Sequence, residues 1–172
     1  MRVINRFSEI IFIVVFLLAV SANSLAGQFK VTRVTDGDTV KITGNGEKIT
    51  VRLVGIDAPE TSKKKNQLGQ PFSKKSTKYL ANLLLNKSVE VKSYGTDRYG
   101  RTLGVVSVEG KDMNLEMVKA GLAEVYRGKP AEGLNLGPYW NAEAEAKKTG
   151  IGMWSLGDKY ISPKEWRRMH RK

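Results

Sequence analysis

The stretch between Asp36 and Glu60 constrains the fold most strongly, because two strand patterns flank a tight reversal within it. V-K-I-T and I-T-V-R-L-V-G-I alternate apolar with polar residues and are rich in β-branched side chains, as half-buried strands are. G-N-G-E lies between them and supplies the glycine and asparagine that a hairpin turn requires. A β-hairpin returns the chain to its starting point, so Asp38 at its start is expected close to Asp57 at its end, with Arg52 inside the second strand.

The rest of the chain alternates short strands with helices. Further strands are expected at 28–35, 87–94 and 101–108, and helices at 71–84, 113–120 and 139–148. Apolar residues at helical spacing predict the core that the first two helices contribute: Phe72, Leu80, Leu83, Leu84, Met113, Leu115, Met117 and Val118. About five strands with about three helices predict an α+β protein that is mainly β, a five-stranded barrel of the oligonucleotide-binding (OB-fold) type.

The N-terminal segment has the pattern of a secretory signal peptide. Arg2 and Arg6 precede the apolar run I-I-F-I-V-V-F-L-L-A-V, which is short for a membrane span, and small residues follow at Ser24 and Ala26. We expect residues 1–26 to be removed, which leaves a secreted or periplasmic protein without stable membrane association. An uncleaved N-terminal anchor is the alternative interpretation.

The mature chain is then expected to consist of one domain at 27–155 and a basic tail at 156–172. In the tail, Ser162 and Glu165 have the spacing of a capping box, and proline stands at the first helical position. This pattern predicts a short basic helix near the C-terminus. No feature of the sequence indicates more than a monomer.

Charge and composition restrict the chemistry. The chain has 29 Lys and Arg against 17 Asp and Glu, a net charge of +12, which is typical of proteins that meet nucleic acid or an anionic membrane. A merely basic protein is the plainer alternative. There is no cysteine, and the single histidine is His170 near the C-terminus, so disulfides, thiolate metal sites and a histidine-based triad are excluded. Carboxylates, arginines, lysines and tyrosines must carry any reaction.

The carboxylates at the strand ends suit a hard cation bound only by oxygen, calcium in preference to magnesium. Asp38 and Asp57 are the expected ligands, with the backbone carbonyl of Ala58 as a third and Asp36 behind them or linked through water. Such a cation would polarise a phosphoryl oxygen.

Three further side chains complete the expected chemistry. Glu60 is the candidate general base that takes a proton from the attacking water. Arg52 and Arg101 are the candidates for stabilising the charge of the transition state, because a guanidinium group binds phosphate oxygens in a bidentate manner.

Each of these motifs also has an ordinary structural interpretation. Asp-Gly is common turn chemistry, and Arg52 on a strand could pair with Glu47 or Glu90 at the surface. The three lysines of T-S-K-K-K-N-Q fit a solvated loop as well as a contact with phosphates. The conjunction of the motifs in one basic chain favours the catalytic interpretation.

In its motifs the sequence resembles the staphylococcal nuclease (thermonuclease) family. The matching residues are D-G-D-T from Asp36, R-L-V-G-I-D-A-P-E from Arg52 and D-R-Y-G-R from Asp97, and the similarity continues to G-I-G-M-W near Trp154. The resemblance implies an OB-fold barrel and a calcium-dependent endonuclease that hydrolyses DNA and RNA and releases products with a 3′-phosphate.

Carried over by position, the resemblance implies calcium ligands at Asp38 and Asp57 and catalytic roles for Arg52, Glu60 and Arg101. It further implies that Arg98 and Tyr99 hold the terminal phosphate of the substrate and that Tyr126 lies near a base. The founding enzyme has threonine at the position of Ala58 and lysine at that of Arg98, exchanges that keep the backbone carbonyl and the positive charge.

Two hypotheses follow. The first is an exported nuclease of low sequence specificity that acts on single-stranded DNA and RNA, because a site that binds phosphates and stacks bases does not read base edges. The second is a catalytically inactive nucleic-acid-binding protein of the cell envelope that uses the same barrel without turnover. Both would bind nucleic acid in a salt-dependent way.

Overall fold

The computed structural model describes residues 29–62 and 68–170. The expected signal peptide and the three consecutive lysines of the predicted loop lie outside these ranges. Within them, no helix combines the length and the apolar composition that crossing a membrane requires.

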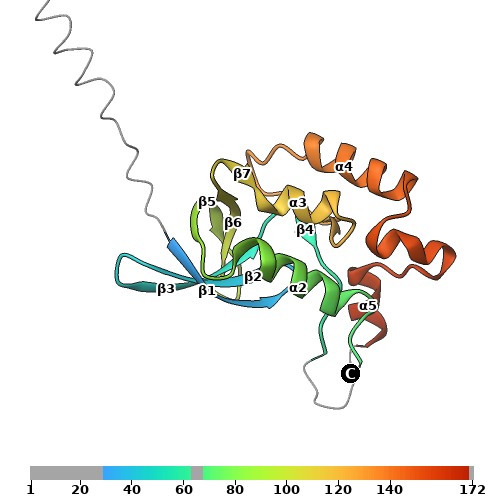
Figure 1. The fold of residues 1–172 in the computed structure, drawn as a ribbon, viewed down its shortest axis with the longest axis horizontal. Coiled ribbons are helices and arrows are strands. Elements are labelled where there is room, and N and C mark those ends of the chain that lie inside the picture. The colour runs from blue at the N-terminus through green and yellow to red at the C-terminus, as the bar shows by residue number, and fades with distance from the viewer. Residues whose placement is uncertain (1–28, 63–67, 171–172) are drawn as a thin grey trace, which may run out of the picture.

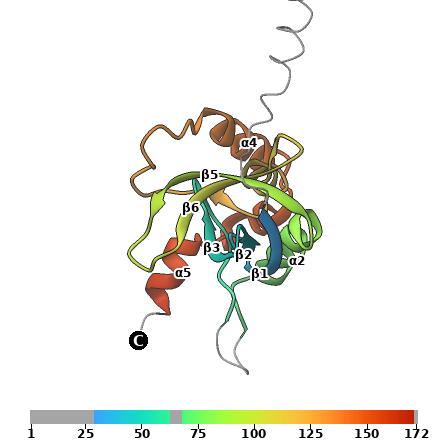
Figure 2. The same cartoon turned by 90° about the vertical axis from the view of Figure 1, so that its left-hand side faces the viewer.

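Five strands form a closed barrel, as the sequence predicts (Figures 1 and 2). They are β1 (Phe29–Asp36), β2 (Thr39–Gly44), β3 (Glu47–Leu53), β5 (Ser88–Thr96) and β6 (Thr102–Val108). Neighbouring strands are antiparallel in the order β3-β2-β1-β5-β6, and a parallel pairing of β3 with β6 closes the barrel. The predicted hairpin is the β2–β3 pair, in which Thr39 lies opposite Arg52.

Helices cover the barrel and extend from it (Figure 1). They are α2 (Ser73–Leu84), α3 (Met113–Lys119), α4 (Gly137–Lys148), the 3₁₀ segment η1 (Gly152–Lys159) and α5 (Pro163–Met169). Helix α2 packs on β1, and α3 packs between β6 and α4. Ser162 caps α5 by accepting a hydrogen bond from the amide of Glu165, so the helix expected in the tail is present.

Three short strands complete the fold. β7 (Lys111–Asp112) extends the barrel sheet at β6, whereas β4 (Ile56–Asp57) and β8 (Glu124–Val125) form a separate antiparallel pair. Gly55, with φ of 82°, makes the turn that separates β3 from β4. The strand that the sequence predicts over residues 49–56 is therefore broken after Leu53, and the short strand that follows, β4, pairs with β8.

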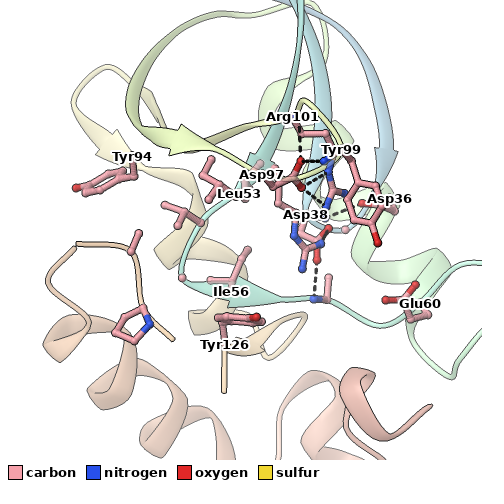
Figure 3. Close-up of a pocket in the computed structure, with 18 of the residues that line it drawn as sticks. Asp36, Asp38, Leu53, Ile56, Glu60, Tyr94, Asp97, Tyr99, Arg101 and Tyr126 are labelled. Atoms are coloured by element: carbon pink, nitrogen blue, oxygen red, sulfur yellow. Dashed lines mark hydrogen bonds and ion pairs between the residues drawn. The ribbon is translucent and has the colours of Figure 1, made fainter. Parts of the chain in front are cut away.

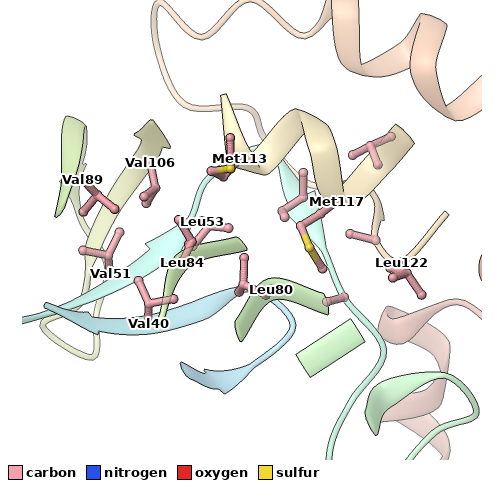
Figure 4. Close-up of a cluster of buried hydrophobic side chains, with 14 of the residues drawn as sticks. Val40, Val51, Leu53, Leu80, Leu84, Val89, Val106, Met113, Met117 and Leu122 are labelled. Atoms are coloured by element: carbon pink, nitrogen blue, oxygen red, sulfur yellow. The ribbon is translucent and has the colours of Figure 1, made fainter. Parts of the chain in front are cut away.

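The core fills the barrel and the space beneath α2 and α3 (Figure 4). Val40, Val51 and Val106 enter it from the strands. Of the helical residues predicted to be core, five are buried and three are partly buried: Leu80, Leu84, Met113, Met117 and Val118, and then Phe72, Leu83 and Leu115.

One polar side chain inside this core fixes the strands that carry the site. Asn114 on α3 is fully buried and donates hydrogen bonds to the carbonyls of Val54 (2.9 Å) and Gly104 (3.0 Å). Its own carbonyl oxygen accepts from the amide of Val106 at 3.1 Å. Asn114 therefore ties α3 to β6 and to the turn between β3 and β4, and it adds to the backbone hydrogen bond from the amide of Val54 to the carbonyl of Gly104.

Candidate active site

Two buried carboxylates form the centre of the site. Asp38 is only 2% exposed and Asp57 only 1%. Arg52 joins them: its Nη2 lies 2.9 Å from Oδ1 of Asp57, and its Nη1 contacts Oδ1 of Asp38. Buried carboxylates need compensating charge or hydrogen bonds. Arg52 therefore belongs to the site and does not form the surface pair with Glu47 or Glu90 that the sequence left open.

Backbone and hydroxyl donors hold Asp38 in place. The amide of Ala58 donates to its Oδ2 at 2.9 Å, and the hydroxyl of Thr39 lies 3.1 Å from its Oδ1. These contacts join the start of β2 to the end of β4. The segments at the open end of the hairpin therefore meet, as the sequence predicts.

The D-G-D motif is more than a turn. A Cβ added at Gly37 would lie 2.7 Å from Cβ of Ala58 and would also clash with the side chain of Ser76 on α2. Glycine is therefore required by close packing between the loop and the helix. Asp36 accepts a hydrogen bond from the amide of Asp38 at 3.2 Å, and burial raises the pKa of Asp36.

Arg101 is held by its own loop. Asp97 Oδ2 accepts from Nε of Arg101 at 2.8 Å and pairs with its Nη2 at 2.7 Å, while Asp97 Oδ1 accepts from the backbone amides of Tyr99 and Arg101. Burial opposes ionisation of Asp97, but these hydrogen bonds outweigh it and lower its pKa. The ring of Tyr99 lies beside both Arg98 and Arg101, 5.0 Å and 5.6 Å from their guanidinium carbons.

These residues line one cavity of about 1080 Å³ (Figure 3). The predicted site residues in its lining are Asp36, Asp38, Arg52, Ala58, Glu60, Arg98, Tyr99, Arg101 and Tyr126. Asp57 is buried beside the lining and reaches it through Arg52. In Figure 3 the Asp97–Arg101 pair and Asp38 lie at one end of the pocket, with Tyr126 further away. The structure thus brings every predicted site residue together, and two unpredicted cations, Lys129 and Arg167, join the lining.

Of these two unpredicted residues, Arg167 on α5 contacts the predicted carboxylates directly. Its Nη1 and Nη2 donate to the two oxygens of Asp57 at 2.9 Å and 2.7 Å, and Nη1 also donates to Oε1 of Glu60 at 2.5 Å. The hydrogen bond to Asp57 is the main cause of the raised pKa of Arg167. The sequence predicts the helix that carries Arg167, but a contact across this sequence distance leaves no local pattern.

The donor chemistry suits a hard cation. Within residues 29–62 and 68–170, no three histidine, cysteine, aspartate or glutamate side chains converge on one point. The oxygen-rich pair Asp38 and Asp57 nevertheless carries two buried negative charges that guanidinium groups compensate. A divalent cation at these carboxylates would compensate the same charge, so the residues present fit such an ion. Ala58 contacts Asp38 through its amide, and a ligand role for the Ala58 carbonyl stays a prediction.

The arrangement as a whole suits an anionic ester substrate. Arginines at the wall of the pocket can bind phosphate oxygens, and Glu60, whose side chain is 33% exposed, can meet water. Exposed aromatic rings of Tyr99 and Tyr126 lie at the same pocket and can stack on bases.

Comparison with known proteins gives consistent matches. Residues 50–156 match the sequence model of the family described as staphylococcal nuclease homologue. A Haemophilus influenzae protein described as an uncharacterized endonuclease is 39% identical over 83% of this chain and 74% of its own length. The micrococcal nuclease of Shigella flexneri is 36% identical over 81% of this chain and 79% of its own. An Escherichia coli O157:H7 protein described as an uncharacterized endonuclease is 39% identical over 83% and 85%.

Proposed function

The chain belongs to the staphylococcal nuclease homologue family and is a nuclease of that family, and we propose that it is a calcium-dependent enzyme that hydrolyses DNA and RNA. The resemblance identified from the sequence is thereby confirmed. The proposed products carry a 3′-phosphate, and the proposed cleavage has low sequence specificity. The observation that supports this most is the ion pair of Arg52 with two buried carboxylates beside a pocket that also contains Glu60 and Arg101.

The arginines bind and orient the scissile phosphate in this proposal. Arg52 and Arg101 come from β3 and from the loop before β6, strands that pair with each other across the barrel closure. The paired strand β3 limits the motion of Arg52, and the contacts with Asp97 limit that of Arg101. Charge that develops on the phosphoryl oxygens is then met by donors already in place, and electrostatic stabilisation of this kind supplies much of the rate enhancement of many enzymes.

Glu60 has the role of general base. It follows the short strand β4 and lines the pocket, and its backbone amide is held by the side chain of Gln70 at 3.0 Å. A carboxylate fixed in this way can accept the proton of an attacking water. When bound by Asp38, Asp57 and the carbonyl of Ala58, calcium would supply positive charge that polarises the phosphoryl oxygen.

The substrate class follows from what the pocket can recognise. Arg98 can bind a phosphate, and Tyr99 and Tyr126, 68% and 40% exposed, offer ring faces to unpaired bases. Phosphates and base faces are common to all sequences and to both sugars. We therefore propose that single-stranded DNA and RNA are both substrates. We also propose that the monomer is the active form, because one chain supplies the lining of the pocket.

Export is part of the proposal and rests on the sequence. Arg2 and Arg6, the apolar run and the small residues up to Ala26 support removal of a signal peptide and a secreted or periplasmic location. N-terminal sequencing of the protein recovered from the periplasm or medium of a bacterial host tests this. A chain recovered only in membranes with its N-terminus intact would contradict it.

Analysis of product ends tests the proposed reaction. The purified protein is incubated with calcium and with matched single-stranded DNA and RNA oligonucleotides, and the products are identified by mass spectrometry. We expect both to be cut, with the phosphate on the 3′ end of each fragment. Salt-dependent binding without any cleavage would favour the nucleic-acid-binding alternative.

A further inference from the structure

Arg167 occupies three of the carboxylate oxygens at the proposed reaction site. Both oxygens of Asp57 accept hydrogen bonds from its guanidinium, and Oε1 of Glu60 accepts a third. Oδ1 of Asp57 also accepts from Arg52 at 2.9 Å. With α5 in this position, Asp57 accepts hydrogen bonds from both Arg52 and Arg167, and Glu60 is paired with Arg167.

A guanidinium and a divalent cation compete for such a carboxylate. Hard cations bind through the same carboxylate oxygens that Arg167 contacts, and both carry positive charge. Glu60 faces the same conflict, because an oxygen that holds Arg167 is not available to an attacking water. The docked position of α5 therefore competes with cation binding at Asp57 and with proton transfer to Oε1 of Glu60.

Apart from the contacts of Arg167, α5 buries little of its own surface. Within the helix, Pro163 is the residue that is buried, and Met169 is 60% exposed. The carbonyl of Ile161, just before the helix, accepts from the side chain of Gln70 at 2.7 Å. An isolated helix of seven residues has little stability of its own. In Figure 2, α5 (red) lies at the periphery of the molecule beside the C-terminus, away from α2.

We propose that α5 is an autoinhibitory helix, which Arg167 locks over the active site and which calcium and the nucleic-acid backbone displace. This inference rests on the proposed nuclease function and describes its regulation. Calcium takes the place of Arg167 at Asp57, and phosphates attract the cations that leave, Lys164, Arg167 and Arg168. Release of α5 frees Glu60 at the moment when substrate is present.

The contact of Arg167 with Asp57 and Glu60, which we call the lock, can be tested without relying on cleavage. The measurement is calcium affinity by isothermal titration calorimetry at low ionic strength. Arg167→Ala is compared with the wild-type protein and with Arg168→Ala, a control on the same helix whose arginine pairs with Glu165 of α5 at 3.0 Å. If α5 is docked about nine-tenths of the time, its loss should tighten calcium binding about tenfold. Arg168→Ala should bind calcium like the wild type.

A second measurement follows the helix itself. In the wild-type protein, the backbone amides of residues 164–169, which follow Pro163, should exchange hydrogen faster when calcium and a single-stranded oligonucleotide are added. Arg167→Lys, which keeps the charge but loses the bidentate fork, should lie between wild type and Arg167→Ala in calcium affinity. Both readouts remain valid whether or not the variants cleave nucleic acid.

Several results would overturn the lock. They are equal or weaker calcium binding by Arg167→Ala, absence of calcium binding in both proteins, or unchanged exchange in α5 at saturating calcium. A lower turnover of Arg167→Ala at saturating calcium, with unchanged affinity, would make Arg167 a substrate contact instead. If Arg167→Ala binds calcium more tightly but no protein cleaves, the lock stands and the nuclease proposal fails. If all the proteins cleave and bind calcium with equal affinity, the nuclease proposal stands and the lock fails.

Discussion

Nη2 of Arg52 lies 2.9 Å from Oδ1 of Asp57, so a strand of the barrel is joined directly to the short strand β4 outside it. The same guanidinium contacts Asp38 through Nη1. Neither carboxylate is accessible enough for water to solvate its charge. Arg52 therefore has two functions, since it keeps the acidic pair compatible with the fold and presents a cation to the pocket.

Replacing Arg52 should affect stability and turnover together. Arg52→Ala leaves two buried carboxylates with less compensation and should lower the free energy of unfolding by about 3–5 kcal/mol without calcium. Turnover should fall about 10²-fold or more. Arg52→Lys keeps the charge and should recover stability more than turnover. Chemical denaturation and initial cleavage rates measure the two effects, and Arg33→Ala, on the exposed side of β1, is the control.

Glu60→Gln should separate catalysis from folding. The side chain is 33% exposed, so loss of its charge should leave the thermal midpoint nearly unchanged, whereas turnover should fall by about 10²-fold or more because the general base is lost. Glu47→Gln, at an exposed position of the hairpin, should change neither quantity. Full activity of Glu60→Gln would remove Glu60 from the mechanism.

Glu143 should make stability depend on pH. Burial alone would raise its pKa, but hydrogen bonds from Lys147, Arg127 and the amide of Val125 outweigh burial and lower it. A carboxyl whose pKa is lower in the folded state stabilises above its unfolded pKa, near 4.5, and loses that contribution as pH falls through the folded value.

Glu143→Gln tests whether the ionised Glu143 stabilises the folded protein at neutral pH. The variant should be less stable than the wild type at neutral pH, and the difference should shrink as the pH is lowered below about 4.5. Urea denaturation at several pH values measures it. Glu145→Gln, on the exposed side of α4, is the matched control. A difference that grows toward acid pH would contradict the assignment.

Asn114 should be a purely structural residue. Asn114→Leu leaves the amide of Val106 and the carbonyl of Val54 without their side-chain partner, and each such buried group costs about 1–3 kcal/mol, while the carbonyl of Gly104 keeps its hydrogen bond from the amide of Val54. The thermal midpoint should fall clearly, while the cleavage rate of the remaining folded protein is retained well below that midpoint. Asn141→Leu, exposed on α4, is the comparison, and an equal loss in both variants would show that the buried network is unimportant.

The parts of the fold that the sequence predicts are those with local patterns. Alternation identified the hairpin of β2 and β3, and helical spacing identified the buried faces of α2 and α3. The two-residue strands β4 and β8 could not be predicted, because a pattern needs more residues than they contain. The 3₁₀ segment η1 has no such periodic pattern either.

The site residues, like the elements of the fold, could be predicted only where a local pattern connects them. Asp38, Arg52 and Asp57 could be placed together because one hairpin connects them. The role of Asp97 in holding Arg101 depends on loop geometry that the letters D-R-Y-G-R do not reveal. The contact of Arg167 with Asp57 spans most of the domain, and only tertiary structure shows it.

The central claim is that this pocket hydrolyses phosphodiester bonds with a cation at Asp38 and Asp57, and a calcium titration of cleavage tests it most directly. The initial rate of cutting of an end-labelled single-stranded DNA is measured with the purified protein after removal of metal by a chelator. We predict no cleavage without calcium and a saturable recovery as calcium is restored, with Asp57→Asn requiring far more calcium. An undiminished rate in excess chelator would contradict the account.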